Sequence, residues 1–127
     1  MDALIKSRWQ SFAYWAAVTI ILLTAARLEI VSAGQESQTI DEAVHLSAGY
    51  SYLKTGDFRL NPEHPPLSKM SSALPLLWLH PDFAPSPRDW EHADQWAVGK
   101  SFLYANRISA DRMLMAGRTM TIGLSLL

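Results

Sequence analysis

The sequence of 127 residues predicts a mostly α-helical integral membrane protein. Three observations lead to this fold class. A strongly apolar run lies near the N-terminus, a polar stretch crowded with acids, histidines and prolines follows it, and a second apolar run begins near residue 118. Hydrophobic residues make up 49% of the chain and charged residues 18%, so charge is thin for a soluble domain and gathers between the two apolar runs.

The first apolar run, residues 9–26, predicts a transmembrane helix. About 20 apolar residues at about 1.5 Å each cross a bilayer core. The run extends to that length through residues 28–31 if Arg27 snorkels to the far interface. Trp9 and Trp15 lie near its start, where an aromatic belt is expected.

Charges on either side of this run predict its orientation. Lys6 and Arg8 precede it and Glu29 begins a series of acids after it. The positive-inside rule therefore places the N-terminus in the cytoplasm. We expect a cell (inner) membrane protein with three parts: 1–33, the cytoplasmic N-terminus and membrane helix; 34–110, a periplasmic or extracellular loop of short amphipathic helices; and 111–127, the start of a second transmembrane helix.

A cleaved signal peptide is the alternative for the same segment. Val31, Ser32 and Ala33 fit the small-residue pattern of a signal-peptidase site, and cleavage there would release a soluble domain. The length of the apolar run and the apolar character of residues 119–127 favour a retained helix.

Helix signals begin directly after residue 38. Thr39 and Glu42 have the spacing of a capping box, and a helix is expected over about 40–54, with Gly56 as its left-handed C-cap. This helix places His45 one turn after Asp41 on the same face.

Prolines divide the rest of the loop. They exclude regular helix from residues 57–63. A second helix is expected over about 66–79, kinked at Pro75 and lying at the membrane interface because it is too short to span. Residues 80–91 read as an irregular loop, and 93–106 as another short helix.

Composition excludes several function classes. The absence of cysteine excludes a disulfide framework, thiolate metal sites and a cysteine nucleophile. A net charge of −1 provides no basic field for nucleic acid, so no nucleic-acid partner is expected. No glycine-rich phosphate loop, Gly-x-Ser-x-Gly elbow or His-Glu-x-x-His motif is present.

The acidic pair Asp41 and Glu42 is the sharpest candidate for chemistry. One carboxylate is suited to general-base or metal work and the other to structure. Acids at a helix N-terminus also serve simply to complement its dipole. His45 is suited to sharing a proton or metal with Asp41, although such pairs also occur as plain surface contacts.

A second set of candidates follows at residues 59–69. Glu63 and His64 lie between prolines, and with Asp41 they have the chemistry to ligate zinc or another divalent ion. A polar turn is the alternative. Arg59 and Lys69 are suited to bind phosphate oxygens, or to anchor the chain at anionic lipid headgroups.

Together these features resemble a known family. The stretch IDEAVHLSAGYSYLKTGDFRLNPEHPPLSK, followed by ALPLL, is similar to the start of GT-C-type membrane glycosyltransferases. More narrowly, it resembles family 39, the protein O-mannosyltransferases and aminoarabinose transferases. The resemblance extends from residue 9 to residue 127. It implies transfer of a sugar from a polyprenyl-phosphate carrier to an extracytoplasmic lipid or protein acceptor.

The resemblance also implies roles for individual residues. Asp41 would be the catalytic acidic residue, acting as a base toward the acceptor or positioning it, with Glu42 as its motif partner. Glu63 would lie near the donor phosphate or a divalent metal ion. His64 stands where aminoarabinose transferases have a lysine before two prolines, which weakens its assignment to phosphate. Lys69 and Arg59 are further phosphate-binding candidates.

Length is the main departure from the family, whose members have many membrane helices and several hundred residues. We therefore expect an N-terminal fragment that is inactive alone and that works with the remaining helices of a split or full-length enzyme. A small non-enzymatic membrane protein with an interaction loop is the alternative.

Overall fold

The computed structural model describes the backbone of residues 2–127 and the side chains of residues 8–127. Within residues 2–127 the chain is all-helical, with seven helices and no strand, which agrees with the predicted helical class. The helices are α1 (Asp2–Gln35), α2 (Glu42–Thr55), α3 (Pro66–Ala73), α4 (Leu76–Leu79), α5 (Pro87–Glu91), α6 (Gln95–Tyr104) and α7 (Ala110–Ser125). The side chain of Lys6, used above for orientation, lies outside the described residues.

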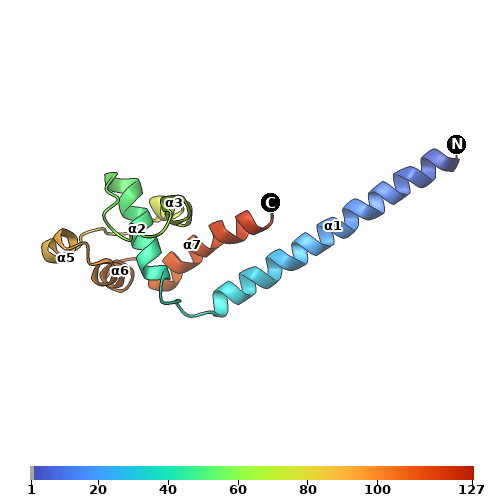
Figure 1. Ribbon diagram of the computed structural model, residues 1–127. Helices are drawn as coiled ribbons and strands as arrows, with labels where there is room; N and C mark the ends of the chain where they lie inside the picture. The colour runs from blue at the N-terminus through green and yellow to red at the C-terminus, as the bar shows by residue number, and fades with distance from the viewer. Residues whose placement is uncertain (1) are drawn as a thin grey trace.

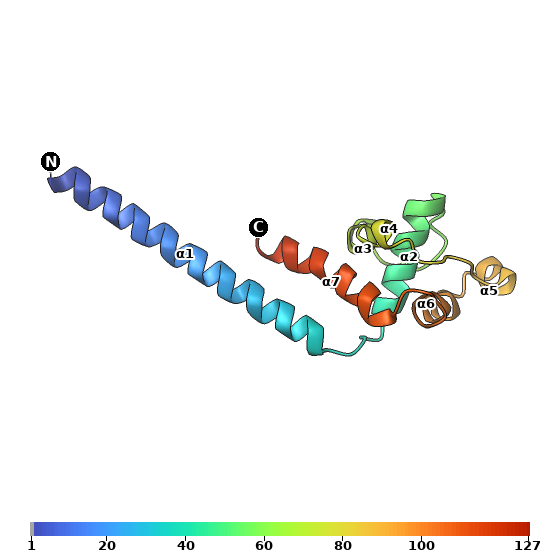
Figure 2. The same cartoon turned by 180° about the vertical axis from the view of Figure 1, so that it is seen from behind.

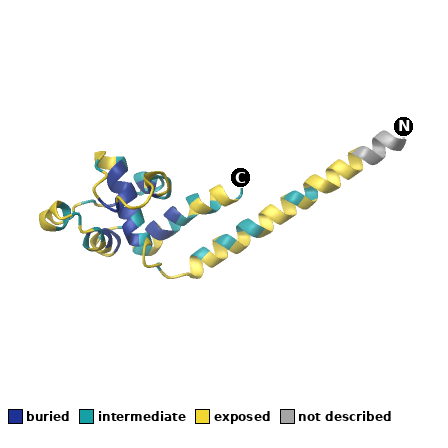
Figure 3. Cartoon of the chain, in the orientation of Figure 1, coloured by how far each residue is buried: buried dark blue, intermediate teal, exposed yellow. Residues whose placement is uncertain are grey.

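Helix α1 extends away from a cluster formed by the other helices (Figures 1 and 2). Its segment Arg8–Gln35, 28 residues, is long and apolar enough to cross a membrane. That segment measures about 42 Å at 1.5 Å per residue, more than a bilayer core of about 30 Å. None of its described side chains is buried (Figure 3). These properties suit a membrane span or a signal sequence.

Helix α2 begins two residues later than the capping box predicts. Asp41, rather than Thr39, occupies the N-cap position and its side chain caps no amide. Half of the predicted box forms, because the Glu42 Oε2 atom accepts a hydrogen bond of 2.8 Å from the Thr39 backbone N–H. The end is as predicted: Gly56 has a φ of 70° and its N–H donates to the Tyr52 carbonyl.

Helix α2 is the centre of the core, and α3, α6 and α7 pack around it (Figures 1 and 3). Nine of the ten consecutive positions 43–52 are buried, the exception being His45, which is why α2 carries small residues between its aromatic ones. Tyr50 is 1% exposed and packs on Phe102 at a centroid distance of 5.3 Å. Burial of such a side chain contributes about 1.5–3 kcal/mol.

A glycine sets the distance between α2 and α3. A Cβ atom at Gly49 would lie 2.1 Å from the carbonyl oxygen of Lys69. We expect Gly49→Ala to push the helices apart and lower the free energy of unfolding by about 1–3 kcal/mol. Thermal unfolding in detergent, followed by tryptophan fluorescence, measures this effect. Gly34→Ala is the matched control, because nothing lies within 4 Å there; an equal loss in both variants would contradict the packing argument.

Three further elements differ from the expected boundaries. The helix expected over 66–79 is broken into α3 and α4 at Leu74–Pro75, which agrees with the predicted disturbance at Pro75. The expectation of an irregular loop over 80–91 is wrong in part, because α5 forms there. Ser86 caps α5 by accepting a hydrogen bond of 3.2 Å from the Asp89 N–H, and a proline follows at the first helical position. Helix α6 falls inside the range expected for it.

Helix α7 runs back along α1, so both apolar helices extend from the same side of the cluster (Figures 1 and 2). The Ser125 hydroxyl donates to the Glu29 carboxylate at 2.7 Å near the far end of this pairing. Helices α1 and α7 thus run antiparallel to each other on one side of the cluster.

Candidate active site

The acidic pair at the start of α2 is divided between two environments. Asp41 is exposed, and its carboxylate takes part in no ion pair among residues 8–127. Glu42, the next residue, is half-buried and paired with Arg118 of α7. One acid is therefore free to meet a ligand while its neighbour is committed to structure.

Arg118 holds Glu42 with both edges of its guanidinium group. Its Nε and Nη2 atoms each donate to a different Glu42 oxygen at 2.7 Å. Three further hydrogen bonds go to the carbonyls of Ala33, Glu36 and Ser37, just at the end of α1. All five N–H donors are used. We call this arrangement the Arg118 clasp. It joins α1, α2 and α7. It also satisfies every donor of an arginine that lies in an apolar run, where an unpaired charge would be costly.

The clasp also controls the protonation of Glu42. Burial alone would raise the pKa of Glu42, but hydrogen bonds from Arg118 and Thr39, with the Arg118 charge, outweigh burial. The pKa of Glu42 is therefore lowered, and the residue is a carboxylate at neutral pH.

Two histidines meet beside this acidic pair. His45 lies one turn after Asp41 on α2, and His64 comes from the segment before α3. Their rings stand edge to face, with centroids 5.3 Å apart and planes at 77°. Burial lowers the pKa of His45; the Asp41 charge opposes this shift, and His64 and Lys69 reinforce it. A neutral imidazole is thus favoured at position 45.

We call residues 61–65 the strap, because they carry Glu63 and His64 alongside α2 and bring the His64 ring to His45. Glu63 accepts hydrogen bonds on Oε1 from the Asn61 Nδ2 atom at 3.1 Å and from the Gln95 Nε2 atom at 3.0 Å. Hydrogen bonds from its own backbone N–H and from Gln95 lower the pKa of Glu63. The carboxylate is therefore held by amides.

The remaining predicted residues fall into two places. Lys69 is 2% exposed and points inward to Tyr52 and Asn61. Arg59 is held elsewhere, 2.7 Å from an Asp57 oxygen and 4.6 Å from the centre of the Trp90 ring. The structure therefore brings together Asp41, Glu42, His45, Glu63, His64 and Lys69, and it leaves Arg59 outside this group.

The described residues do not by themselves form a metal centre. Within residues 8–127, no group of three or more histidine, aspartate or glutamate side chains is placed to hold a metal ion. The expected ligands Glu63 and His64 lack a converging third acid, since Asp41 does not complete such a group.

Two cavities adjoin the Arg118 clasp. A groove of about 560 Å³ runs between α1 and α7, with Glu29, Ser32 and Glu36 on the α1 side. A pocket of about 190 Å³ between α2, α3 and α7 includes His45 and Ser72 in its wall. Glu42, Arg118 and Thr121 line both. The clasp thus separates a groove between the apolar helices from a pocket next to the histidine pair.

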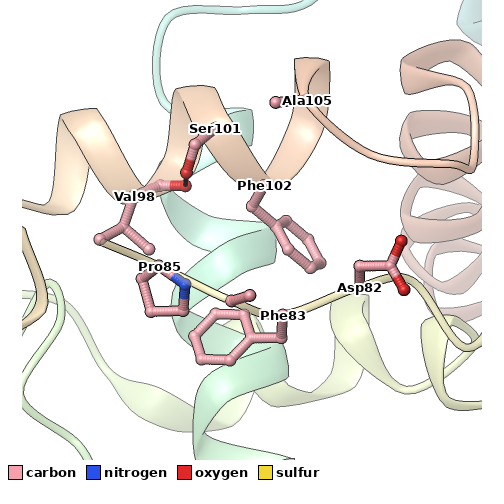
Figure 4. Close-up of a pocket in the computed structure, with 8 residues that line it drawn as sticks. Asp82, Phe83, Pro85, Val98, Ser101, Phe102 and Ala105 are labelled. Atoms are coloured by element: carbon pink, nitrogen blue, oxygen red, sulfur yellow. Dashed lines mark hydrogen bonds between the residues drawn. The ribbon is translucent and has the colours of Figure 1, made fainter. Parts of the chain in front are cut away.

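A third cavity lies away from this group and is smaller, about 110 Å³ (Figure 4). Phe83 and Phe102 meet there edge to face, with ring centroids 5.8 Å apart and planes at 69°. Its one acid, Asp82, is paired with Arg107 at 3.2 Å. Four of its lining residues, Asp82, Ala84, Ser101 and Ala105, are exposed, so this cavity is a hollow at the surface beside the core.

Sequence reasoning missed three members of the site, namely Tyr52, Asn61 and Gln95. Tyr52 and Gln95 carry no local signal, because helix positions of this kind usually only pack or face solvent. Asn61 has a φ of 51°, a conformation in which asparagine is enriched, and it directly precedes a proline. That dipeptide was the one signal available for it.

No protein-family model matches the chain, and neither a curated protein nor a solved structure shows significant similarity to it. The relation to family 39 therefore remains an expectation drawn from the residues themselves.

Proposed function

We propose that this chain is the N-terminal part of a GT-C-type membrane glycosyltransferase. The whole enzyme would transfer a sugar from a polyprenyl-phosphate carrier to an extracytoplasmic lipid or protein acceptor. The observation that supports this proposal most is the difference in environment between two adjacent acids at the start of α2. Arg118 holds Glu42, and the neighbouring Asp41 is left exposed beside the His45–His64 pair.

In the proposed reaction, Asp41 accepts the proton of an acceptor hydroxyl as that oxygen attacks the anomeric carbon. The bond between the anomeric carbon and the phosphate oxygen breaks, its electron pair leaves with the polyprenyl phosphate, and the configuration inverts. Negative charge grows on the leaving phosphate, so a nearby donor or cation lowers the barrier. The exposed imidazole of His64 is the side chain we assign to that task.

The groove between α1 and α7 is the feature that favours a lipid-linked donor in this proposal. It opens between the two apolar helices, and its walls combine apolar surface with carboxylate and hydroxyl groups. A polyprenyl chain is compatible with the apolar part; polar groups lie at both ends, the clasp at one and the Ser125–Glu29 hydrogen bond at the other. Arg59 stands apart from these residues, and we assign it to an anionic lipid headgroup.

The active unit includes further membrane helices. The described residues contain one helix able to span a bilayer, whereas enclosing a polyprenyl carrier requires several. We therefore propose that this chain acts together with other helices and does not transfer sugar by itself. Transfer by the purified chain alone would contradict this part of the proposal.

Membrane topology is the simplest part of the proposal to test. We expect an inner-membrane protein with a cytoplasmic N-terminus and a periplasmic loop. Because the chain lacks cysteine, single cysteines report position cleanly. In intact cells a membrane-impermeant maleimide should label Ser37→Cys, and Ser7→Cys, which precedes the apolar run, only after permeabilisation. A product that begins at Gly34 would contradict the anchor and favour a cleaved signal.

The direct test of function is a transfer assay. Membranes from cells that carry the intact gene are incubated with radiolabelled polyprenyl-phosphate hexoses and pentoses, and label in lipid and protein fractions is compared with membranes from a deletion strain. The proposal expects gene-dependent label from at least one donor. Equal label in both membranes with every donor would contradict the proposal and favour the non-enzymatic alternative.

A further inference from the structure

Lys69 is a buried lysine without a carboxylate partner at hydrogen-bond distance. It lies in α3, is 2% exposed, and directs its ammonium group toward α2 and the strap. Burial lowers the pKa of Lys69, and the more distant Glu63 charge opposes that shift. Lysine is almost never fully buried unless its donors are satisfied. The hydrogen-bond partners of the ammonium group should therefore explain why Lys69 is buried.

Every N–H direction of the ammonium group has an acceptor. Nζ donates to the Tyr52 hydroxyl at 3.0 Å, to the Asn61 Oδ1 atom at 3.0 Å, and to the Asn61 backbone carbonyl. The Tyr52 ring centre lies 5.1 Å from the same nitrogen. An ammonium group carries three donors. No donor of Lys69 is left for a phosphate.

Asn61 links the hydrogen bonds of Lys69 to the position of the strap. Its φ of 51° turns the chain at that residue. Both of its oxygens face Lys69, so its Nδ2 atom faces the other way and donates to Glu63 at 3.1 Å and Gln95 at 2.8 Å. Lys69 thus determines the orientation of the Asn61 side-chain amide. Because only Pro62 separates Asn61 from Glu63, the position of Asn61 also determines where Glu63 and His64 lie.

We propose that Lys69 is a positioning residue that pins the strap so that His64 stands against His45, and that it is not a ligand of the donor phosphate. The part of this inference that concerns catalysis rests on the proposed function. The part that concerns the position of the strap does not, and the two parts are tested by separate experiments.

The geometric test uses a cysteine pair. The double variant His45→Cys, His64→Cys places thiols where the two rings now meet, and a short bifunctional thiol reagent should join them in the full chain in membranes. Adding Lys69→Met keeps the length and apolar stem of the side chain but removes the ammonium group. Crosslinking is expected to be lost.

Matched variants separate positioning from loss of fold. Lys54→Met removes an exposed lysine from the last turn of α2 and should leave crosslinking intact. Asn61→Gly tolerates the positive φ and retains the carbonyl acceptor, but removes all three side-chain hydrogen bonds of Asn61; crosslinking should fall here too, with the thermal unfolding transition retained. Unchanged crosslinking in folded Lys69→Met or Asn61→Gly would overturn the inference.

The activity test distinguishes the two roles of a lysine. A positioning role predicts that Lys69→Met lowers kcat about a hundredfold, as a displacement of about 1 Å does, with little change in the donor KM. A phosphate ligand predicts a raised donor KM, and that result would overturn the inference. Absence of transfer in the unchanged enzyme would refute the proposed function alone, because the crosslinking result does not depend on activity.

Discussion

Sugar transfer is expected to fall by about 10²–10⁴-fold in Asp41→Asn, the range that general-base catalysis contributes. The amide keeps the shape of the carboxylate but cannot accept the acceptor's proton. The loss should appear in kcat rather than in the donor KM, because Asp41 is assigned to the acceptor. The measurement is the initial rate of transfer in membranes that contain the complete enzyme at matched expression.

The fold should not change in Asp41→Asn. Asp41 is exposed, occupies the N-cap position and bonds to no amide through its side chain. Asparagine is as good an N-cap residue as aspartate. Asp111→Asn, an exposed acid in the first turn of α7, is the control and should retain full transfer. Equal rates for Asp41→Asn and the unchanged enzyme would contradict the assignment.

Arg118→Met is expected to lower the free energy of unfolding by about 2–4 kcal/mol and to reduce transfer with it. The pair with Glu42 is mostly buried, at 14% and 23% side-chain exposure. Removing one partner leaves a half-buried carboxylate and three carbonyls without their donor, and such a loss costs about 3–5 kcal/mol when burial is complete. Thermal unfolding in detergent measures the change.

Two variants sharpen this prediction. Arg112→Met removes an exposed arginine one and a half turns earlier on α7 and should change stability little. Arg118→Lys should not restore stability, because an ammonium group cannot make two parallel bonds to a carboxylate. Wild-type stability in Arg118→Met would mean that the clasp is not what joins α1, α2 and α7.

The clasp also predicts a pH dependence. The pKa of Glu42 is lower in the fold than its ordinary 4.5. A lowered carboxyl pKa stabilises the fold fully above the unfolded-state value, and the contribution disappears as pH falls through the folded-state value. The stability from Glu42 should therefore persist above about pH 5 and be lost at lower pH. In Glu42→Gln the same acid limb should be shallower; an unchanged limb would contradict the shift.

Local rules were sufficient for most of the helical framework. The apolar run before residue 34 predicts α1. A bilayer or a signal receptor recognises the length and hydropathy of such a run, and both are properties of consecutive residues that can be read from the sequence. Gly56 predicts the end of α2, since only the residue and its own φ matter there. The α5 helix was missed although Ser86 and Pro87 supply a cap and a first position, because several neighbouring prolines favoured an irregular loop.

The site was predictable as a list of residues but not as an arrangement. Asp41, His45 and the Glu63–His64 pair stand out by type and spacing. That Glu42 is committed to Arg118, 76 positions away, depends on how α7 packs against α1 and α2. That Lys69 turns inward depends on the close approach of α3 at Gly49. Chain-local patterns determine which helices form, whereas the partner of each charged group depends on which helices pack together. Long-range packing alone decided which acid is exposed to a ligand and which lysine holds the strap.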